Sequence, residues 1–212
     1  MLSPGQSFSK YKIIRLLGTG MRGEVYHAWD NQLERAVALK VLTGWLGPDL
    51  VSDEVGERGG HAWPGLTTTL SHRNIAAVWE VGSEQGVSYI ASELIIGTTL
   101  RTVLSQGALS ESSALILAVQ IAEGLTAAHG ARVVHRALKP ENVIVSAEGV
   151  VKLLDFSLGR EYQLPLDLEE TVSTERTQGV SWLDVISYMS PEQISGGSVD
   201  FRSDQFSFGT VL

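Results

Sequence analysis

Alternation of apolar and polar residues dominates the first ninety residues and predicts β-strands. Segments with this pattern, rich in β-branched and aromatic residues, lie at Lys12–Leu17, Glu24–Trp29, Ala36–Leu42, Val78–Val81 and Val87–Ser92. Glycine-bearing turns separate the first pair and the last pair of these segments. The first part of the chain is therefore expected to form a sheet.

The hydrophobic period changes after Gly97. Apolar residues then recur at helical spacing from Leu115 to His129, with Ser110 as the predicted N-cap and Gly130 as the predicted C-cap. Beyond this helix the pattern predicts short strands at Asn142–Val145 and Val150–Leu153, a polar loop over 160–179, and a final helix over Ser203–Leu212. A strand-rich lobe over residues 1–94, followed by a helix-rich lobe over 95–212, is an α+β arrangement.

Composition and charge narrow the function classes. The chain has 212 residues, of which 43% are hydrophobic, and a formal net charge of −8, which argues against nucleic acid as a partner. It has no cysteine, so a disulfide or a thiolate metal site is excluded. The longest apolar stretch, Leu115–Ala122, is too short to cross a membrane, and no secretory signal is visible. We expect a cytoplasmic protein with no membrane segment in this chain.

A glycine-rich turn between the first two predicted strands is a candidate phosphate-binding loop. Its pattern is G-x-G-x-x-G-x-V, formed by Gly18, Gly20, Gly23 and Val25. Glycines allow backbone N–H groups to approach phosphate oxygens, although a simple hairpin turn would also explain them. The residues after Gly23 alternate like a strand, whereas a dinucleotide-binding loop would open a helix. Lys40, inside the third apolar strand, either contacts phosphates or is an exposed strand lysine.

Motifs later in the chain carry a family resemblance. His135, Arg136 and the run Leu138–Asn142 are followed by Asp155 and then by Ser190–Glu192, in the order and spacing of the protein kinase signature. The chain resembles protein kinase domains of the bacterial serine/threonine type over essentially its whole length. The resemblance implies the two-lobed kinase fold with an incomplete second lobe, because the chain ends early in that lobe's central helix. A fragment of a longer protein is the expected explanation.

The resemblance also implies roles for individual residues. Those expected to bind ATP are Gly18, Gly20, Gly23, Val25, Ala38, Lys40, Glu93, Ile95 and Ile144. Among them, Lys40 would contact the phosphates, and Glu93 and Ile95 would offer backbone hydrogen bonds to adenine. Asn142 and Asp155 would hold Mg²⁺, and Lys139 would approach the transferred phosphate. His135 and Phe156 are expected to pack in the core.

The pattern breaks where the family carries its catalytic aspartate. This position is Ala137, and a methyl group can neither accept nor orient the proton of an attacking hydroxyl. The glutamate that would pair with Lys40 falls at Trp63, the glycine after Asp155 and Phe156 is replaced by Ser157, and a supporting threonine is replaced by Val185. In the family, the glutamate at Glu192 pairs with a later arginine.

These departures favour an ATP-binding pseudokinase that acts in signalling, with a protein substrate or a partner kinase as its protein ligand. The alternatives are an active serine/threonine kinase with an atypical catalytic loop and a non-functional remnant.

Overall fold

A computed structural model of the chain describes residues 1–20, 23–42, 70–156 and 186–212. The chain divides into two compact units. Unit 1 comprises Met1–Leu70 and Ala76–Ile95, and unit 2 comprises Ser71–Ile75 and Ile96–Leu212.

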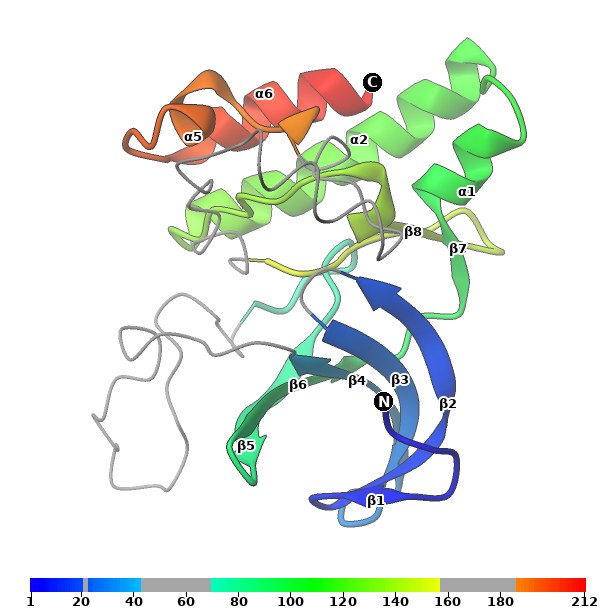
Figure 1. Cartoon of the computed structure of the whole chain (residues 1–212). Helices are drawn as coiled ribbons and strands as arrows, with labels where there is room; N and C mark the ends of the chain where they lie inside the picture. The colour runs from blue at the N-terminus through cyan, green and yellow to red at the C-terminus, as the bar shows by residue number, and fades with distance from the viewer. Residues whose placement is uncertain (21–22, 43–69, 157–185) are drawn as a thin grey trace, which may run out of the picture. The chain divides into compact units, whose positions relative to one another are not determined.

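Unit 1 is built on a six-stranded antiparallel sheet with the strand order β1-β2-β3-β4-β6-β5 (Figure 1). The strands are β1 (Ser7–Phe8), β2 (Tyr11–Gly20), β3 (Gly23–Asp30), β4 (Arg35–Leu42), β5 (Val78–Glu84) and β6 (Val87–Glu93). All five strands expected in this region are present. The short edge strand β1 was missed, because two residues carry no readable alternation.

One face of this sheet forms the core of unit 1. Its buried members come from four strands and are Tyr11, Ile13, Tyr26, Ala28, Val37, Leu39, Val41, Tyr89 and Ala91. Successive residues of a strand point to opposite faces, so burying the odd-numbered positions of β4 places Ala38 and Lys40 on the other face. The core therefore determines which face can meet a ligand.

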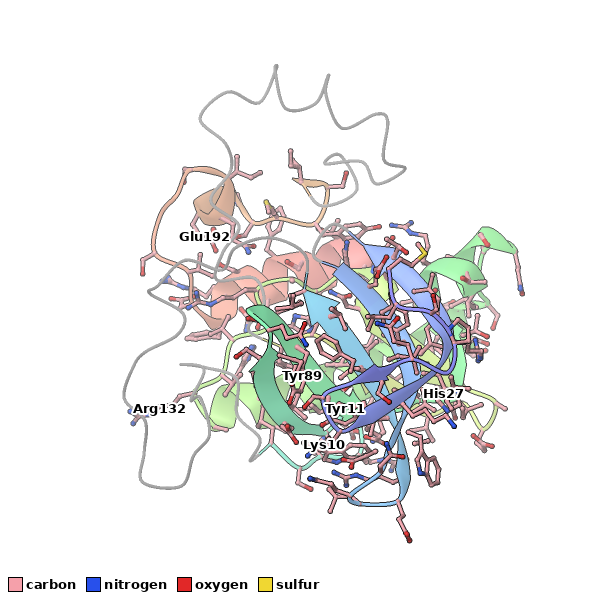
Figure 2. The ribbon with its side chains drawn as sticks, turned by 60° about the horizontal axis from the view of Figure 1, so that its bottom comes forward. Lys10, Tyr11, His27, Tyr89, Arg132 and Glu192 are labelled. Carbon is pink, nitrogen blue, oxygen red and sulfur yellow. The ribbon has the colours of Figure 1, made fainter. Side chains whose placement is uncertain are left out.

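A charged cluster lies at the margin of this core. The Glu80 carboxylate accepts hydrogen bonds from Lys10, from Tyr11 at 3.1 Å and from Tyr89 at 2.7 Å. Figure 2 shows Lys10, Tyr11 and Tyr89 gathered in one region of the sheet. Burial opposes ionisation of Glu80, but the hydrogen bonds from Lys10, Tyr89 and Tyr11 outweigh it and lower the pKa of this carboxyl group.

Unit 2 combines helices with a three-stranded antiparallel sheet of order β7-β8-β9. Its elements are β7 (Gly97–Thr99), α1 (Leu100–Ser105), α2 (Glu111–Gly130), η2 (Pro140–Asn142), β8 (Val143–Ser146), β9 (Val151–Leu153), α5 (Pro191–Ile194) and α6 (Phe201–Val211). Figure 1 shows α6 running close to α2, and the 2.7 Å contact between His129 and Asp204 joins these two helices.

The predicted element boundaries of unit 2 need local corrections. Ser110 caps α2 as expected, but Gly130 is the last helical residue and Ala131 is the C-cap. Asn142 belongs to the 3₁₀ turn η2 rather than to a strand, because Pro140 opens a helical turn before β8. Helix α6 begins at Phe201, two residues before the predicted start, since the Asp200 side chain accepts a hydrogen bond from the Arg202 N–H.

Three further short elements, β7, α1 and α5, were not anticipated, and the loop expected over 160–179 lies outside the described residues. Within the part of the chain that the structure describes, no helix is long and apolar enough to span a membrane. The strand-rich first part and the helix-containing second part confirm the α+β class.

Candidate functional site

Three of the expected ATP-binding residues share one face of the unit 1 sheet. Val25 on β3 lies directly opposite Lys40 on β4, and His27 lies opposite Ala38. Opposed residues of an antiparallel pair project to the same side, so Val25, Ala38 and Lys40 form a continuous strip. This strip lies on the face away from the tyrosine-rich core. An apolar surface beside an ammonium group is suited to an aromatic base that carries phosphates.

The glycines of the candidate phosphate loop are explained by different features of the structure. Gly23 has φ of +137°, and a β-carbon built on it would overlap the carbonyl oxygen of Val41. Gly23 is therefore required by strand packing, whatever the loop binds. A β-carbon on Gly18 or Gly20 would meet no described atom within 4 Å. Their absence of side chains is not explained by packing, which leaves room for close approach of a ligand.

Glu93 and Ile95 lie at the end of unit 1, and the division between the units falls after Ile95. The Glu93 N–H donates to the Ala77 carbonyl at 2.8 Å, and the Glu93 carboxylate accepts from the Ala77 N–H at 3.2 Å. An adenine contact from the Glu93 backbone therefore has to come from its carbonyl oxygen.

Asp204 holds the backbone at His135 and Arg136 in unit 2. Its fully buried carboxylate accepts hydrogen bonds from the N–H groups of His135, at 2.8 Å, and Arg136, at 2.7 Å. His129 Nε2 lies 2.7 Å from the same carboxylate. Arg136 has φ of +66°, a conformation that is costly for a side chain other than glycine. These hydrogen bonds stabilise it in that conformation.

The loop around Ala137 is held on both sides. The Gln193 side chain donates to the Arg136 carbonyl at 2.7 Å, and the Asn142 side chain donates to the Ala137 carbonyl at 2.8 Å. The Ala137 N–H lies 3.3 Å from His135 Nδ1. Ala137, which carries no carboxylate, therefore lies on a backbone that is hydrogen-bonded on both sides. Sequence reasoning missed Asp204 and Gln193 as supports; a lone aspartate inside the apolar pattern of α6 was the available signal.

The two expected magnesium ligands are brought together by backbone contacts. The N–H of Leu154, the residue before Asp155, donates to the Asn142 carbonyl at 2.9 Å. Asn142 uses its amide nitrogen for Ala137, so its Oδ1 is the acceptor atom that remains for a metal. Asp155 has φ of +61°. One carboxylate and one amide oxygen fit Mg²⁺ that completes its shell with phosphate oxygens and water.

Two further expected site residues, Ile144 and Lys139, lie in unit 2. Ile144 on β8 pairs with Thr99 on β7 and with Lys152 on β9, and Lys139 immediately precedes η2. Among the described residues, no group of three or more His, Cys, Asp or Glu side chains could hold a metal by itself. A metal at Asn142 and Asp155 would therefore depend on the ligand's own oxygens.

His135 and Phe156 pack as expected. Both are buried, with ring centres 4.4 Å apart. Burial lowers the pKa of the His135 imidazole, and the negative charges of Asp204 and Asp155 only partly oppose this. The Glu192 carboxylate accepts a hydrogen bond from the Ser203 hydroxyl, and its pairing with a later arginine stays a prediction. Trp63, Ser157 and Val185 lie outside the described residues.

Comparison with known proteins identifies the relatives of this chain. A family model described as the protein kinase domain matches residues 11–212. Serine/threonine-protein kinase PknD of Mycobacterium tuberculosis is 32% identical over 209 residues, which cover 98% of this chain and 30% of that protein. Serine/threonine-protein kinase PrkC of Bacillus subtilis is 32% identical over 204 residues, covering 96% of this chain and 30% of that protein.

The fold comparison agrees. The crystal structure of the PknI kinase domain from M. tuberculosis superposes with a TM-score of 0.72 at 25% sequence identity, covering 100% of this chain and 74% of that one. The chain spans about 30% of the length of the curated relatives it matches. The resemblance inferred from the motifs is therefore confirmed.

Proposed function

Because this chain belongs to the protein kinase domain family, we propose that it binds ATP with Mg²⁺ and that Ala137 impairs phosphate transfer, so that it acts in signalling as a pseudokinase. The observation that carries this proposal is the loop around Ala137, which is hydrogen-bonded on both sides and carries a methyl group where the family pattern places a carboxylate. A protein substrate or a partner kinase in the cytoplasm is the proposed protein ligand.

Each unit contributes its own residues to nucleotide binding in this proposal. In unit 1, Val25 and Ala38 offer the apolar surface for the base, and Lys40 neutralises phosphate charge. The open positions at Gly18 and Gly20 let backbone N–H groups reach phosphate oxygens. These contacts require no proton transfer, so the change at Ala137 leaves them intact.

Unit 2 supplies the metal ligands and the charge near the transferred phosphate. Asn142 and Asp155 would hold Mg²⁺, which neutralises charge on the phosphate oxygens when it is bound. Ile144 would lie against the base and Lys139 near the terminal phosphate. Asp155 and Arg136 both adopt positive φ, and such conformations persist where the surrounding contacts determine them.

The chemical step is where Ala137 matters. A protein kinase uses a carboxylate at this position to orient the acceptor hydroxyl and to take its proton. Loss of a positioned general base slows a reaction by about 10²–10⁴-fold, which corresponds to about 3–5 kcal/mol of activation free energy. Binding is therefore expected to survive and transfer to be slow.

An active kinase is the second candidate function. It is favoured by the retention of Lys40, Lys139, Asn142 and Asp155, which is more of the machinery than nucleotide binding alone would need. A non-functional remnant is the third candidate, and a non-cooperative thermal transition would support it.

Thermal unfolding with and without Mg-ATP tests the proposal. Ligand at 100 times its dissociation constant stabilises the folded state by about 2.7 kcal/mol, so the melting temperature should rise. Asp155→Asn should reduce the shift that depends on magnesium. Asp200→Asn removes one exposed negative charge elsewhere in unit 2 and should leave the shift unchanged. No shift at millimolar Mg-ATP in the unchanged chain would refute ATP binding.

A further inference from the structure

Arg101 on α1 joins three segments of unit 2 that are far apart in the sequence. Its Nε donates a hydrogen bond to Glu141 Oε1 at 2.7 Å, and its Nη2 donates to the Tyr188 hydroxyl at 2.9 Å. These partners are 40 and 87 residues away along the chain. One guanidinium group therefore ties the turn η2 to the segment that leads into α5.

Glu141 depends on this contact because its other carboxylate oxygen is buried. Within the described ranges, Oε2 of Glu141 has no hydrogen-bond partner. A buried carboxylate oxygen without a partner is unfavourable, and the positive charge of Arg101 offsets part of that cost. Without the guanidinium group, the carboxylate would be more stable turned toward water, and the turn that carries it would shift.

Such a shift would reach the candidate metal ligand directly. Glu141 is the residue before Asn142, and the Asn142 N–H closes the same turn on the Lys139 carbonyl at 2.9 Å. The Asn142 amide also donates to the Ala137 carbonyl at 2.8 Å. A movement of Glu141 therefore changes where Oδ1 of Asn142 points.

We propose that Arg101 is a positioning residue that holds Asn142 in the orientation needed to bind the magnesium ion of a bound nucleotide, and that Tyr188 orients Arg101. This inference rests on the proposed ATP binding. Arg101 and Glu141 are both partly exposed, so their ion pair contributes little to folding stability. Its effect is expected on metal affinity, because groups that orient a metal ligand tune the metal strongly.

The test compares nucleotide binding with and without the metal. Isothermal titration of the 212-residue chain with a non-hydrolysable ATP analogue, in excess Mg²⁺ and in EDTA, gives two dissociation constants. The dissociation constant in EDTA divided by the one in Mg²⁺ is the ratio that measures the contribution of the metal. Arg101→Met keeps an unbranched apolar stem and removes the guanidinium donors, and Arg101→Lys keeps the charge. Tyr188→Phe removes one hydroxyl group. Arg202→Met is the control, since Arg202 pairs with Asp200 at the start of its own helix.

Arg101→Met should lower the ratio by about tenfold while changing affinity in EDTA by less than about twofold. Arg101→Lys and Tyr188→Phe should lower it less, and Arg202→Met should match the unchanged chain. Glu141→Gln combined with Arg101→Met should have no larger effect than the greater of the two single changes, because the two residues act through one contact.

Two outcomes would overturn the proposal. An unchanged ratio in Arg101→Met and Tyr188→Phe would show that Arg101 does not act on the metal site. An equal loss of affinity with and without Mg²⁺ would assign Arg101 a structural role only. If the unchanged chain bound no analogue in either condition, the proposed ATP binding would fail and this inference with it, so the unchanged chain separates the two failures.

Discussion

Replacing Asp204 should destabilise unit 2 more than replacing Asp200, the N-cap of the same helix. The carboxylate accepts three hydrogen bonds, of 2.7, 2.8 and 2.7 Å, from His129, His135 and Arg136. Asp204→Asn keeps one oxygen, but its amide NH₂ must face at least one donor. That leaves a buried N–H without an acceptor, which costs about 1–3 kcal/mol, and it removes a charged acceptor, which costs about 1.5–3 kcal/mol per hydrogen bond.

With one buried donor left unpaired and one charged hydrogen bond lost, the expected loss for Asp204→Asn is about 2.5–6 kcal/mol, a large part of the 5–15 kcal/mol typical of a folded domain. Urea unfolding followed by far-UV circular dichroism is the suitable assay, because the long helix α2 and its neighbour α6 both lie in unit 2. Asp200→Asn is the matched control. It caps the same helix, asparagine caps equally well, and the change should cost less than about 0.5 kcal/mol. Equal stabilities of the two variants would refute the role given to Asp204.

Two other predictions concern the core and the glycine turn. Because burial lowers the pKa of His135, the unfolded state binds more protons below about pH 6.5, and stability should fall as pH drops from 7.5 to 5.5, by at most about 1.4 kcal/mol per pH unit for one proton. His135→Asn should flatten this slope in pH-dependent urea unfolding; an unchanged slope would contradict the assignment. Gly23→Ala should destabilise unit 1 by at least about 1–3 kcal/mol, since φ of +137° is strained for alanine. Gly18→Ala, which meets open space, should change the unfolding free energy by less than about 0.5 kcal/mol in the same assay, and equal effects of the two substitutions would refute this distinction.

Long periodic segments were predictable from the sequence, and short elements were not. The alternation over Ala36–Leu42 and the Ser110 cap of α2 identified their elements because each burial pattern extends over several residues. β7 and α5 contain three and four residues, too few for a period to appear. Their positions depend on tertiary contacts, such as the hydrogen bond from the Gln193 side chain to the Arg136 carbonyl.

The residues of the candidate site divide in the same way, into those that the sequence predicts and those that it does not. The candidate nucleotide residues were readable because glycine, lysine and acidic residues recur at spacings that reflect phosphate and metal chemistry. The supports were not readable, since Asp204 and Arg101 act on residues 68 and 40 positions away. Their roles appear only when the folded chain brings these side chains to Arg136 and Glu141.

The most direct test of the account is single-turnover phosphate transfer by the unchanged chain and by Ala137→Asp, under conditions where both bind Mg-ATP. The account predicts that restoring the carboxylate on this supported loop speeds transfer to a serine-containing protein by about 10²–10⁴-fold. Equal rates in the two proteins, with transfer abolished by Asp155→Asn, would contradict it, because another group would then be taking the proton.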